Sequence, residues 1–248
     1  MLKARIKNVG EWKAILNAIG DIVEEAMFIV NNDGITFRGM DAAHVALLDV
    51  TFPKSSFDEL DARTSFFGLK IDDFKTVMNS AGNDDTVELN IVNEATMKVS
   101  VKGSFFTEYN LKLLPKQEVN TPIPKSEYKS KISIEPDTLT RIISNIQHIS
   151  EYMTISCDPE KVEFSAIGDV GDAKINLEKG NPELKELLSS ELTSAVYSLE
   201  YMTKVVRDIG RASKSVNMEY SSRNPIHILF EMPSMTRVEY YLAPRVEN

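Results

Sequence analysis

The chain repeats itself, and this repetition constrains the possible folds more than any other feature of the sequence. A shift of 127 residues places nine apolar residues of the first half on apolar residues of the second half without a gap. The first set is Ile15, Leu16, Ile19, Ile22, Phe28, Ile35, Phe37, Leu48 and Val50, and the second is Ile142, Ile143, Ile146, Ile149, Ile155, Val162, Phe164, Ile175 and Leu177. A shift of 129 residues likewise places Leu111, Leu113 and Pro115 on Tyr240, Leu242 and Pro244. The sequence therefore predicts two halves with similar folds.

A segment with three prolines separates the two halves. Pro115, Pro122 and Pro124 lie in residues 115–128, which otherwise contain few apolar side chains. Proline has no backbone N–H group, and it favours extended backbone in the residue before it. We therefore expect an N-terminal domain at residues 1–115, an extended surface connector at 116–128 and a C-terminal domain at 129–248.

Each half carries two short helical patterns among segments that alternate like β-strands. Apolar residues with the spacing of one helix face begin at Trp12, Phe74, Leu139 and Met202, at intervals of 62, 65 and 63 residues. Alternation of apolar and polar residues predicts strands at 26–30, 34–39, 45–52, 86–92, 96–102 and 109–114, with counterparts in the second half. This pattern indicates an α+β fold of two similar domains, each with antiparallel β-sheets and two helices.

Charge is unevenly distributed over the chain. With 28 basic and 37 acidic residues its net charge is −9, which argues against phosphate binding by the surface as a whole. The positions that face away from the apolar side of the four helices nevertheless hold five bases and one acid: Lys13, Lys75, Arg141, Lys204, Arg207 and Asp208. Arg211 and Lys214 continue this basic side. Such faces suit weak contact with duplex phosphates without base reading, and solvated faces of chance composition are the alternative.

The sequence contains no recognisable catalytic or metal-binding motif. It has neither the phosphate-binding pattern GxxxxGK[ST] nor the nucleophile pattern GxSxG. Its single cysteine, Cys157, excludes an internal disulfide, and its three histidines are far apart, at His44, His148 and His227. Asp72 and Asp73 could suggest a metal-dependent nuclease, but acidic residues at a helix start are better explained by capping. We therefore expect a protein that is not an enzyme and needs neither metal nor cofactor.

Four segments resemble the proliferating cell nuclear antigen family of DNA sliding clamps, and most closely its archaeal members. They are residues 34–48 (GITFRGMDAAHVALL), 81–85 (AGNDD), 164–177 (FSAIGDVGDAKINL) and 240–245 (YYLAPR), in family order along the whole chain. The resemblance implies a two-domain subunit, three copies of which close into a ring with helices lining a central hole. Such a ring encircles double-stranded DNA without sequence preference and acts as a processivity factor. The bases on the predicted helices would then face the DNA.

The same resemblance implies a pocket that receives a short peptide motif of partner proteins, by insertion of a one-turn helix. The pocket residues would be Met40, His44, Val45, Leu47, Ile123, Pro225, Tyr241, Ala243, Pro244 and Val246. Thr121 departs from the family, because related chains often carry a larger aliphatic residue at this place in the connector. The partners implied are a clamp loader, DNA polymerase, flap endonuclease, DNA ligase and other proteins with the motif.

The resemblance also implies where subunits meet. A strand at residues 109–114 of one subunit would pair with residues 173–177 of the next, through Tyr109, Leu111, Leu113, Lys174, Ile175 and Leu177. Whether the three subunits are identical stays open at this point. Two other functions also stay open: a peptide-binding scaffold that never encircles DNA, and a metal-dependent DNA-processing enzyme.

We expect the protein to be intracellular, without membrane contact. No apolar run approaches the roughly 18 residues that cross a bilayer, and the N-terminus alternates like a strand instead of resembling a signal peptide. The compartment would be the cytoplasm, at the nucleoid, in an archaeon and the nucleus in a eukaryote.

Overall fold

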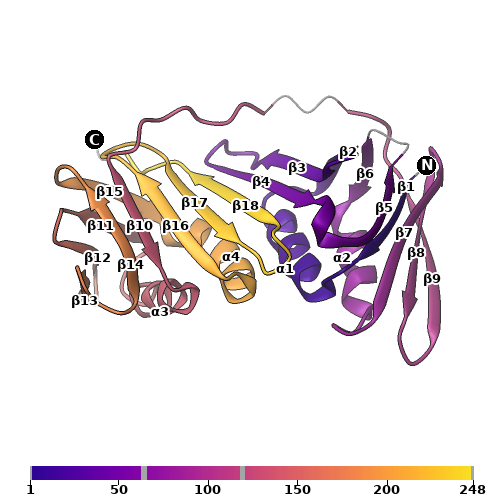
Figure 1. The fold of residues 1–248 in the computed structure, drawn as a ribbon. Helices are drawn as coiled ribbons and strands as arrows, with labels where there is room; N and C mark the ends of the chain where they lie inside the picture. The colour runs from indigo at the N-terminus through magenta and orange to yellow at the C-terminus, as the bar shows by residue number, and fades with distance from the viewer. Residues whose placement is uncertain (1, 63–65, 118–120, 247–248) are drawn as a thin grey trace. The chain divides into compact units, whose positions relative to one another are not determined.

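A computed structural model describes residues 2–62, 66–117 and 121–246 (Figure 1). The chain forms two compact units. Unit 1 contains Met1–His44, Leu48–Thr121 and Met232–Val238, and unit 2 contains Val45–Leu47, Pro122–Glu231 and Glu239–Asn248.

The two halves of the chain contain the same elements in the same order. The first half contains β1 (Leu2–Ile6), α1 (Val9–Gly20), β2 (Glu25–Asn31), β3 (Gly34–Met40), β4 (Ala46–Pro53), β5 (Phe57–Ala62), β6 (Phe66–Lys70), α2 (Ile71–Ser80), β7 (Thr86–Asn93), β8 (Thr96–Lys102) and β9 (Phe106–Lys112). The second contains β10 (Ser130–Ile134), α3 (Pro136–Ile146), β11 (Tyr152–Cys157), β12 (Lys161–Gly168), β13 (Gly171–Glu178), β14 (Leu184–Ser189), β15 (Thr193–Ser198), α4 (Leu199–Ile209), β16 (Ser215–Tyr220), β17 (Ile226–Glu231) and β18 (Arg237–Leu242). Two short 3₁₀ turns, η1 (Lys54–Ser56) and η2 (Gly210–Ala212), complete them. The predicted duplication and the four predicted helices are confirmed.

Strand pairing is duplicated as well. The order β5-β1-β7-β8-β9 in the first half matches β14-β10-β16-β17-β18 in the second, and β4-β3-β2-β6 matches β13-β12-β11-β15. The pairings that carry a residue register, such as β7 with β8 and β12 with β13, are antiparallel. Among the described strands, β9 pairs only with β8, and β13 pairs only with β12. Each of these two strands therefore has one open edge of backbone donors and acceptors.

In unit 1 an aromatic cluster lies beneath the helices. α1 and α2 pack against each other. The indole of Trp12 stacks on Phe52 with 4.1 Å between ring centroids and meets Phe74 edge-on at 6.3 Å. The apolar face predicted for the first helix, Trp12, Ile15, Leu16 and Ile19, is at most 2% exposed. Burial of these large side chains stabilises the helices, which are too short to be stable alone.

In unit 2 two tyrosines take the place of that cluster. Tyr197 and Tyr220 meet edge-on with 6.4 Å between ring centroids, and both are fully buried. Their hydroxyls donate to the carbonyl oxygens of Asn224 at 2.9 Å and Ile155 at 3.2 Å, so no polar atom of these rings is buried without a partner. Burial raises the pKa of the Cys157 thiol, and this side chain packs as a small apolar group.

Helix starts follow from local residues. The side chain of Asn8 accepts from the backbone N–H of Glu11 at 3.1 Å, and its amide donates to the Glu11 carboxylate at 2.7 Å, which closes a reciprocal cap on α1. α3 begins with Pro136, whose missing N–H has no helical acceptor at this position. The expectation that Asp72 and Asp73 cap a helix was wrong in one respect. They lie in the first turn of α2, where they favour the helix dipole, while the N-cap is Lys70 and makes no side-chain cap bond.

Two strands of the first half escape the alternation pattern. β5 carries Asp58, Glu59 and Asp61 and is mostly polar, and β6 is only five residues long. Pairing of β5 with β1 and of β6 with β2 makes them strands. β9 begins at Phe106 and ends at Lys112, so Leu113 and Leu114 lie beyond it.

The described part of the connector contains neither helix nor strand. Residues 118–120, which belong to the predicted connector, lie outside the described residues. None of the described helices has the length and apolar composition that a membrane-spanning helix needs.

Candidate functional site

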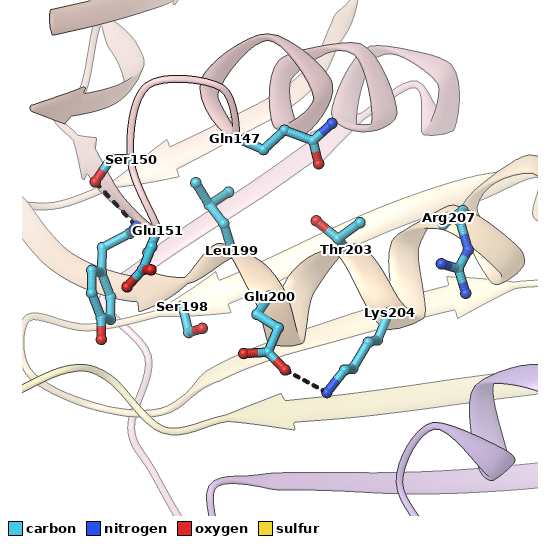
Figure 2. A pocket seen from close by; sticks show the side chains of 10 residues that line it. Gln147, Ser150, Glu151, Ser198, Leu199, Glu200, Thr203, Lys204 and Arg207 are labelled. Atoms are coloured by element: carbon cyan, nitrogen blue, oxygen red, sulfur yellow. Dashed lines mark hydrogen bonds and ion pairs between the residues drawn. The ribbon is translucent and has the colours of Figure 1, made fainter. Parts of the chain in front are cut away.

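The basic residues of unit 2 lie on α3, on α4 and on the turn that follows α4. Arg141, Arg207 and Arg211 are exposed, and Lys204 is half-buried. Figure 2 shows Lys204 and Arg207 on one side of α4, with Gln147 of the α3 end opposite them. These residues, with Thr203, Ser150 and Tyr152 among others, line a cavity of about 530 Å³. The surface therefore combines cationic side chains with neutral hydrogen-bonding groups.

Acidic neighbours partly neutralise these bases. Lys204 pairs with Glu200 at 2.8 Å, one helical turn away, as Figure 2 shows, and Arg207 pairs with Asp208 at 3.2 Å. Ion pairs between exposed side chains are worth only about 0–1 kcal/mol, so a phosphate can compete for the same bases. The α4 surface is thus a weak, mobile cation array instead of a tight anion site.

A second concave surface lies between the start of α3 and η2. Its volume is about 630 Å³, and its lining includes three bases, Arg141, Arg211 and Lys214. Arg141 pairs with Glu183 at 3.4 Å. Arg211 makes no ion pair or hydrogen bond with the described residues, so its guanidinium can meet an anion without breaking an existing bond.

Lys13 and Lys75 in unit 1 are more enclosed than their place in the sequence suggests. The Lys13 ammonium donates to the carbonyl oxygen of Ala81, directly after α2. Lys75 pairs with Asp72 at 3.3 Å, and only 24% of its side chain is exposed. Both lysines lie where α1 and α2 pack together, a contact that helical periodicity does not reveal. A DNA contact of these two lysines stays a prediction.

Several predicted pocket residues lie together in unit 2. The backbone N–H of Ala243 donates to the carbonyl oxygen of Val45 at 2.9 Å. Ile123, Pro225 and Pro244 are half-buried and Val246 is 78% exposed. Leu47 is only 2% exposed, so it can support a pocket from below but offers little contact area. The surface near the chain end is therefore apolar and accessible.

Met40 and His44 belong to unit 1. His44 is exposed with a φ of 58°, and its N–H donates to the carbonyl oxygen of Asp41 at 3.0 Å. Met40 lines a cavity of about 340 Å³ that also includes Arg38 and Thr121. A peptide site shared by the residues of both units stays a prediction.

A stack of three rings holds Tyr241 in place. The His227 ring lies 4.6 Å from the Tyr241 ring and 6.0 Å from the Tyr128 ring, nearly parallel to both. The two imidazole nitrogens lie 3.3 Å from Glu219 and 3.0 Å from Glu239, and the Tyr241 hydroxyl donates to Glu239 at 3.0 Å. The connector residue Tyr128 and the pocket residue Tyr241 thus share one rigid support, which sequence reasoning missed.

A cavity beside β15 also escaped sequence reasoning. It measures about 280 Å³ and is lined by Ser194, Ala195, Val196, Arg223, Pro244, Arg245 and Val246. Pro244 and Val246 were predicted, but the other five were not. Since these residues come from three separate segments, no local pattern marks them.

The predicted subunit-contact residues lie at the two open strand edges. Tyr109 and Leu111 are on β9, while Lys174, Ile175 and Leu177 are on β13. Leu113 follows β9, and its N–H donates to the carbonyl oxygen of Ala95 at 2.9 Å. An open edge can add a strand of another chain.

The described parts of the chain contain no group of three His, Cys, Asp or Glu side chains placed to hold a metal ion. The interfaces described above are therefore surfaces of contact and hydrogen bonding.

Both halves match models of one protein family. Residues 1–114 match the N-terminal domain of proliferating cell nuclear antigen, and residues 122–245 match its C-terminal domain. The chain is 35% identical to the DNA polymerase sliding clamp of Nitrosopumilus maritimus and 33% identical to that of Cenarchaeum symbiosum, each over 246 residues that cover 99% of this chain and 98% of the relative. The crystal structure of PCNA from Thermococcus kodakaraensis matches with a TM-score of 0.93 at 21% identity, over 99% of this chain and 100% of that one. This likeness confirms the predicted two-domain α+β fold.

Proposed function

Because the chain belongs to the proliferating cell nuclear antigen family of DNA polymerase sliding clamps, we propose that it is one of three subunits in a closed ring around duplex DNA. The observation that carries this proposal is the family match over both halves and nearly the whole length. The ring holds DNA by topology and holds replication enzymes by its peptide pocket. The subunit itself catalyses no reaction.

The open edges of β9 and β13 support ring closure. Head-to-tail pairing of one such edge with the other on the next subunit is a heterologous contact, which closes into a ring when the rotation between neighbours is right. The proposed contact residues are Tyr109, Leu111, Leu113, Lys174, Ile175 and Leu177.

The helix surface supports contact with DNA. Lys13, Lys75, Arg141, Lys204, Arg207 and Arg211 are proposed to face the duplex, with exposed Ser144, Asn145 and Gln147 as water-bridging neighbours. The contacts are weak, since a deep local minimum would stop sliding along the DNA. The acidic remainder of the chain, which has a net charge of −9, keeps DNA from binding elsewhere.

The proposed partners follow from the same family. They are a clamp loader, DNA polymerase, flap endonuclease, DNA ligase and other proteins with the short motif, docked at the pocket that includes Tyr241, Ala243 and Pro244. We retain the division into residues 1–115, 116–128 and 129–248. The ring works where the genome is: at the nucleoid in an archaeal cytoplasm or in a eukaryotic nucleus.

Retention on circular DNA tests the encircling ring. The protein is loaded by a clamp loader onto nicked circular DNA, washed at high salt to remove electrostatic binding, and then challenged with a nuclease that cuts the circle once. We expect retention on the circle and loss after the cut. Equal retention before and after the cut contradicts a ring and favours a scaffold. Divalent-metal-dependent DNA cleavage by the purified protein would instead support the enzyme alternative.

Removal of three bases from α4 and η2 should weaken electrostatic contact with DNA. In the triple variant Lys204→Gln, Arg207→Gln and Arg211→Gln, we expect the slope of log affinity against log salt for a short duplex to fall by about 1 to 3, since each lost phosphate contact contributes about 0.9. The matched control, Lys129→Gln, Lys131→Gln and Lys161→Gln, removes the same charge elsewhere on unit 2. Equal changes in both triple variants would show that only net charge matters.

A further inference from the structure

The cavity beside β15 differs from the rest of the predicted pocket because it carries two arginines. Its walls are Ala195, Val196 and Pro244 on the apolar side, with Arg223 and Arg245 as the charged lining. Both arginines are exposed. Two cations at one small, partly apolar cavity are a specific feature in a chain with a net charge of −9.

The walls of this cavity are held in place by hydrogen bonds. The N–H of Arg245 donates to the carbonyl oxygen of Val196 at 2.7 Å, which fixes the C-terminal segment along β15. The N–H of Ser194 donates to the hydroxyl of Ser222 at 3.0 Å, and Ser222 directly precedes Arg223. The cavity is therefore formed before any ligand arrives, so binding loses little conformational entropy.

The two arginines are in different states. The Arg245 guanidinium lies 4.0 Å above the Tyr152 ring, which limits its motion without using its N–H donors. Arg223 makes no hydrogen bond or ion pair with the described residues. A guanidinium forms paired hydrogen bonds with a carboxylate, and apolar walls strengthen such a bond by excluding water.

We propose that this cavity receives an aspartate or glutamate side chain from an extended segment of the partner peptide, next to the one-turn helix that fills the apolar pocket. The inference rests on the proposed peptide-docking function and adds a charge preference to it. Arg223 is the primary carboxylate partner, and Arg245 adds positive charge from the opposite segment. Partner segments with lysine at this place are disfavoured, because like charges would be held together.

Synthetic peptides with one common aliphatic and aromatic one-turn anchor test this proposal. Their extended flank carries a single Asp, Asn or Lys, which is moved along the flank position by position. At one or two adjacent positions we expect the Asp peptide to bind about five- to tenfold tighter than the Asn peptide, with a preference that shrinks as salt is added. Equal affinities of the Asp, Asn and Lys peptides at every position would overturn the proposal.

Charge exchange identifies the partner residue. Arg223→Glu should reverse the order, so that the Lys peptide binds tighter than the Asp peptide, and Arg223→Gln should abolish the preference. Arg223 has a φ of 61°, and these unbranched replacements avoid the added strain of β-branched residues there. Lys161→Gln, which removes a charge from the same unit outside the cavity, should leave the preference unchanged. A preference for Asp that survives in Arg223→Glu contradicts the assignment.

The same measurements separate this inference from the proposed function. If no anchor peptide binds the wild-type chain, peptide docking itself fails. If the anchor binds with equal affinity whatever the flank residue, only the charge preference fails. If the Asp preference is equal in wild-type, Arg223→Gln and Arg223→Glu chains, the carboxylate binds at another place.

Discussion

Replacement of Ile175 by aspartate is expected to leave the subunit folded and to weaken its association with neighbouring subunits by about a hundredfold or more. Ile175 lies in the middle of β13 and is half-buried, on the same side of the strand as the buried Leu177. In the separate subunit a carboxylate at this place still reaches water. In the proposed ring it would be enclosed against β9 without a partner, and an unpaired buried charge costs about 3–5 kcal/mol.

A neighbouring substitution controls for charge alone. Asn176→Asp adds the same charge on the same strand, but this side chain is exposed and points to the other side. Mass in solution, measured by light scattering against the 27.9 kDa of one chain, distinguishes subunit from ring. If the wild-type chain is single by itself, the measurement is repeated with sister subunits. Equal dissociation by both variants, or by neither, contradicts the proposed edge pairing.

Replacement of Tyr241 by alanine should weaken binding of the anchor peptide by about thirtyfold or more while the ring stays intact. Aromatic residues at the centre of such pockets typically contribute about 2 kcal/mol or more, and about 1.4 kcal/mol corresponds to tenfold in affinity. The Tyr241 ring packs on His227 with 4.6 Å between centroids, two residues before Ala243. Its loss leaves a void beneath the surface that the peptide contacts.

Tyr241→Phe is the matched control for this variant. It keeps the ring stack and removes only the hydrogen bond to Glu239, so peptide affinity should change by no more than about threefold, since one such bond contributes about 0.5–1.5 kcal/mol. Calorimetric titration with the peptide gives the affinity, and thermal unfolding shows whether the variant is folded. Undiminished peptide binding by a folded Tyr241→Ala ring would remove Tyr241 from the pocket.

Helices were predicted more completely than strands. The apolar residues at Trp12, Phe74, Leu139 and Met202 each lie in one of the four helices, because the period of a helix face is written in neighbouring residues. β5 escaped the same approach, since Asp58, Glu59 and Asp61 make it polar, and only its register with β1 makes it a strand. That register joins Leu2 to Ala62, a separation along the chain that no local pattern spans.

The candidate sites divide in the same way. Arg207 and Arg211 could be placed on an accessible surface from helical spacing and from the basic residues that follow the helix. The enclosure of Lys13 and Lys75 could not, because it results from the packing of α1 on α2. Arg223 is preceded and followed by ordinary turn residues, and only folding brings it to the cavity beside β15.

The sequence by itself determined the duplication, the four helices, the α+β class and the family, because apolar periods and family motifs are local and survive without coordinates. Only the tertiary structure decided which strand edges stay open, which bases stay accessible and which residues enclose the β15 cavity. The physical reason is that an edge, an exposed charge and a cavity are each defined by what packs beside them. In this chain those neighbours come from distant segments, as when Arg245 bonds to Val196 across the sequence.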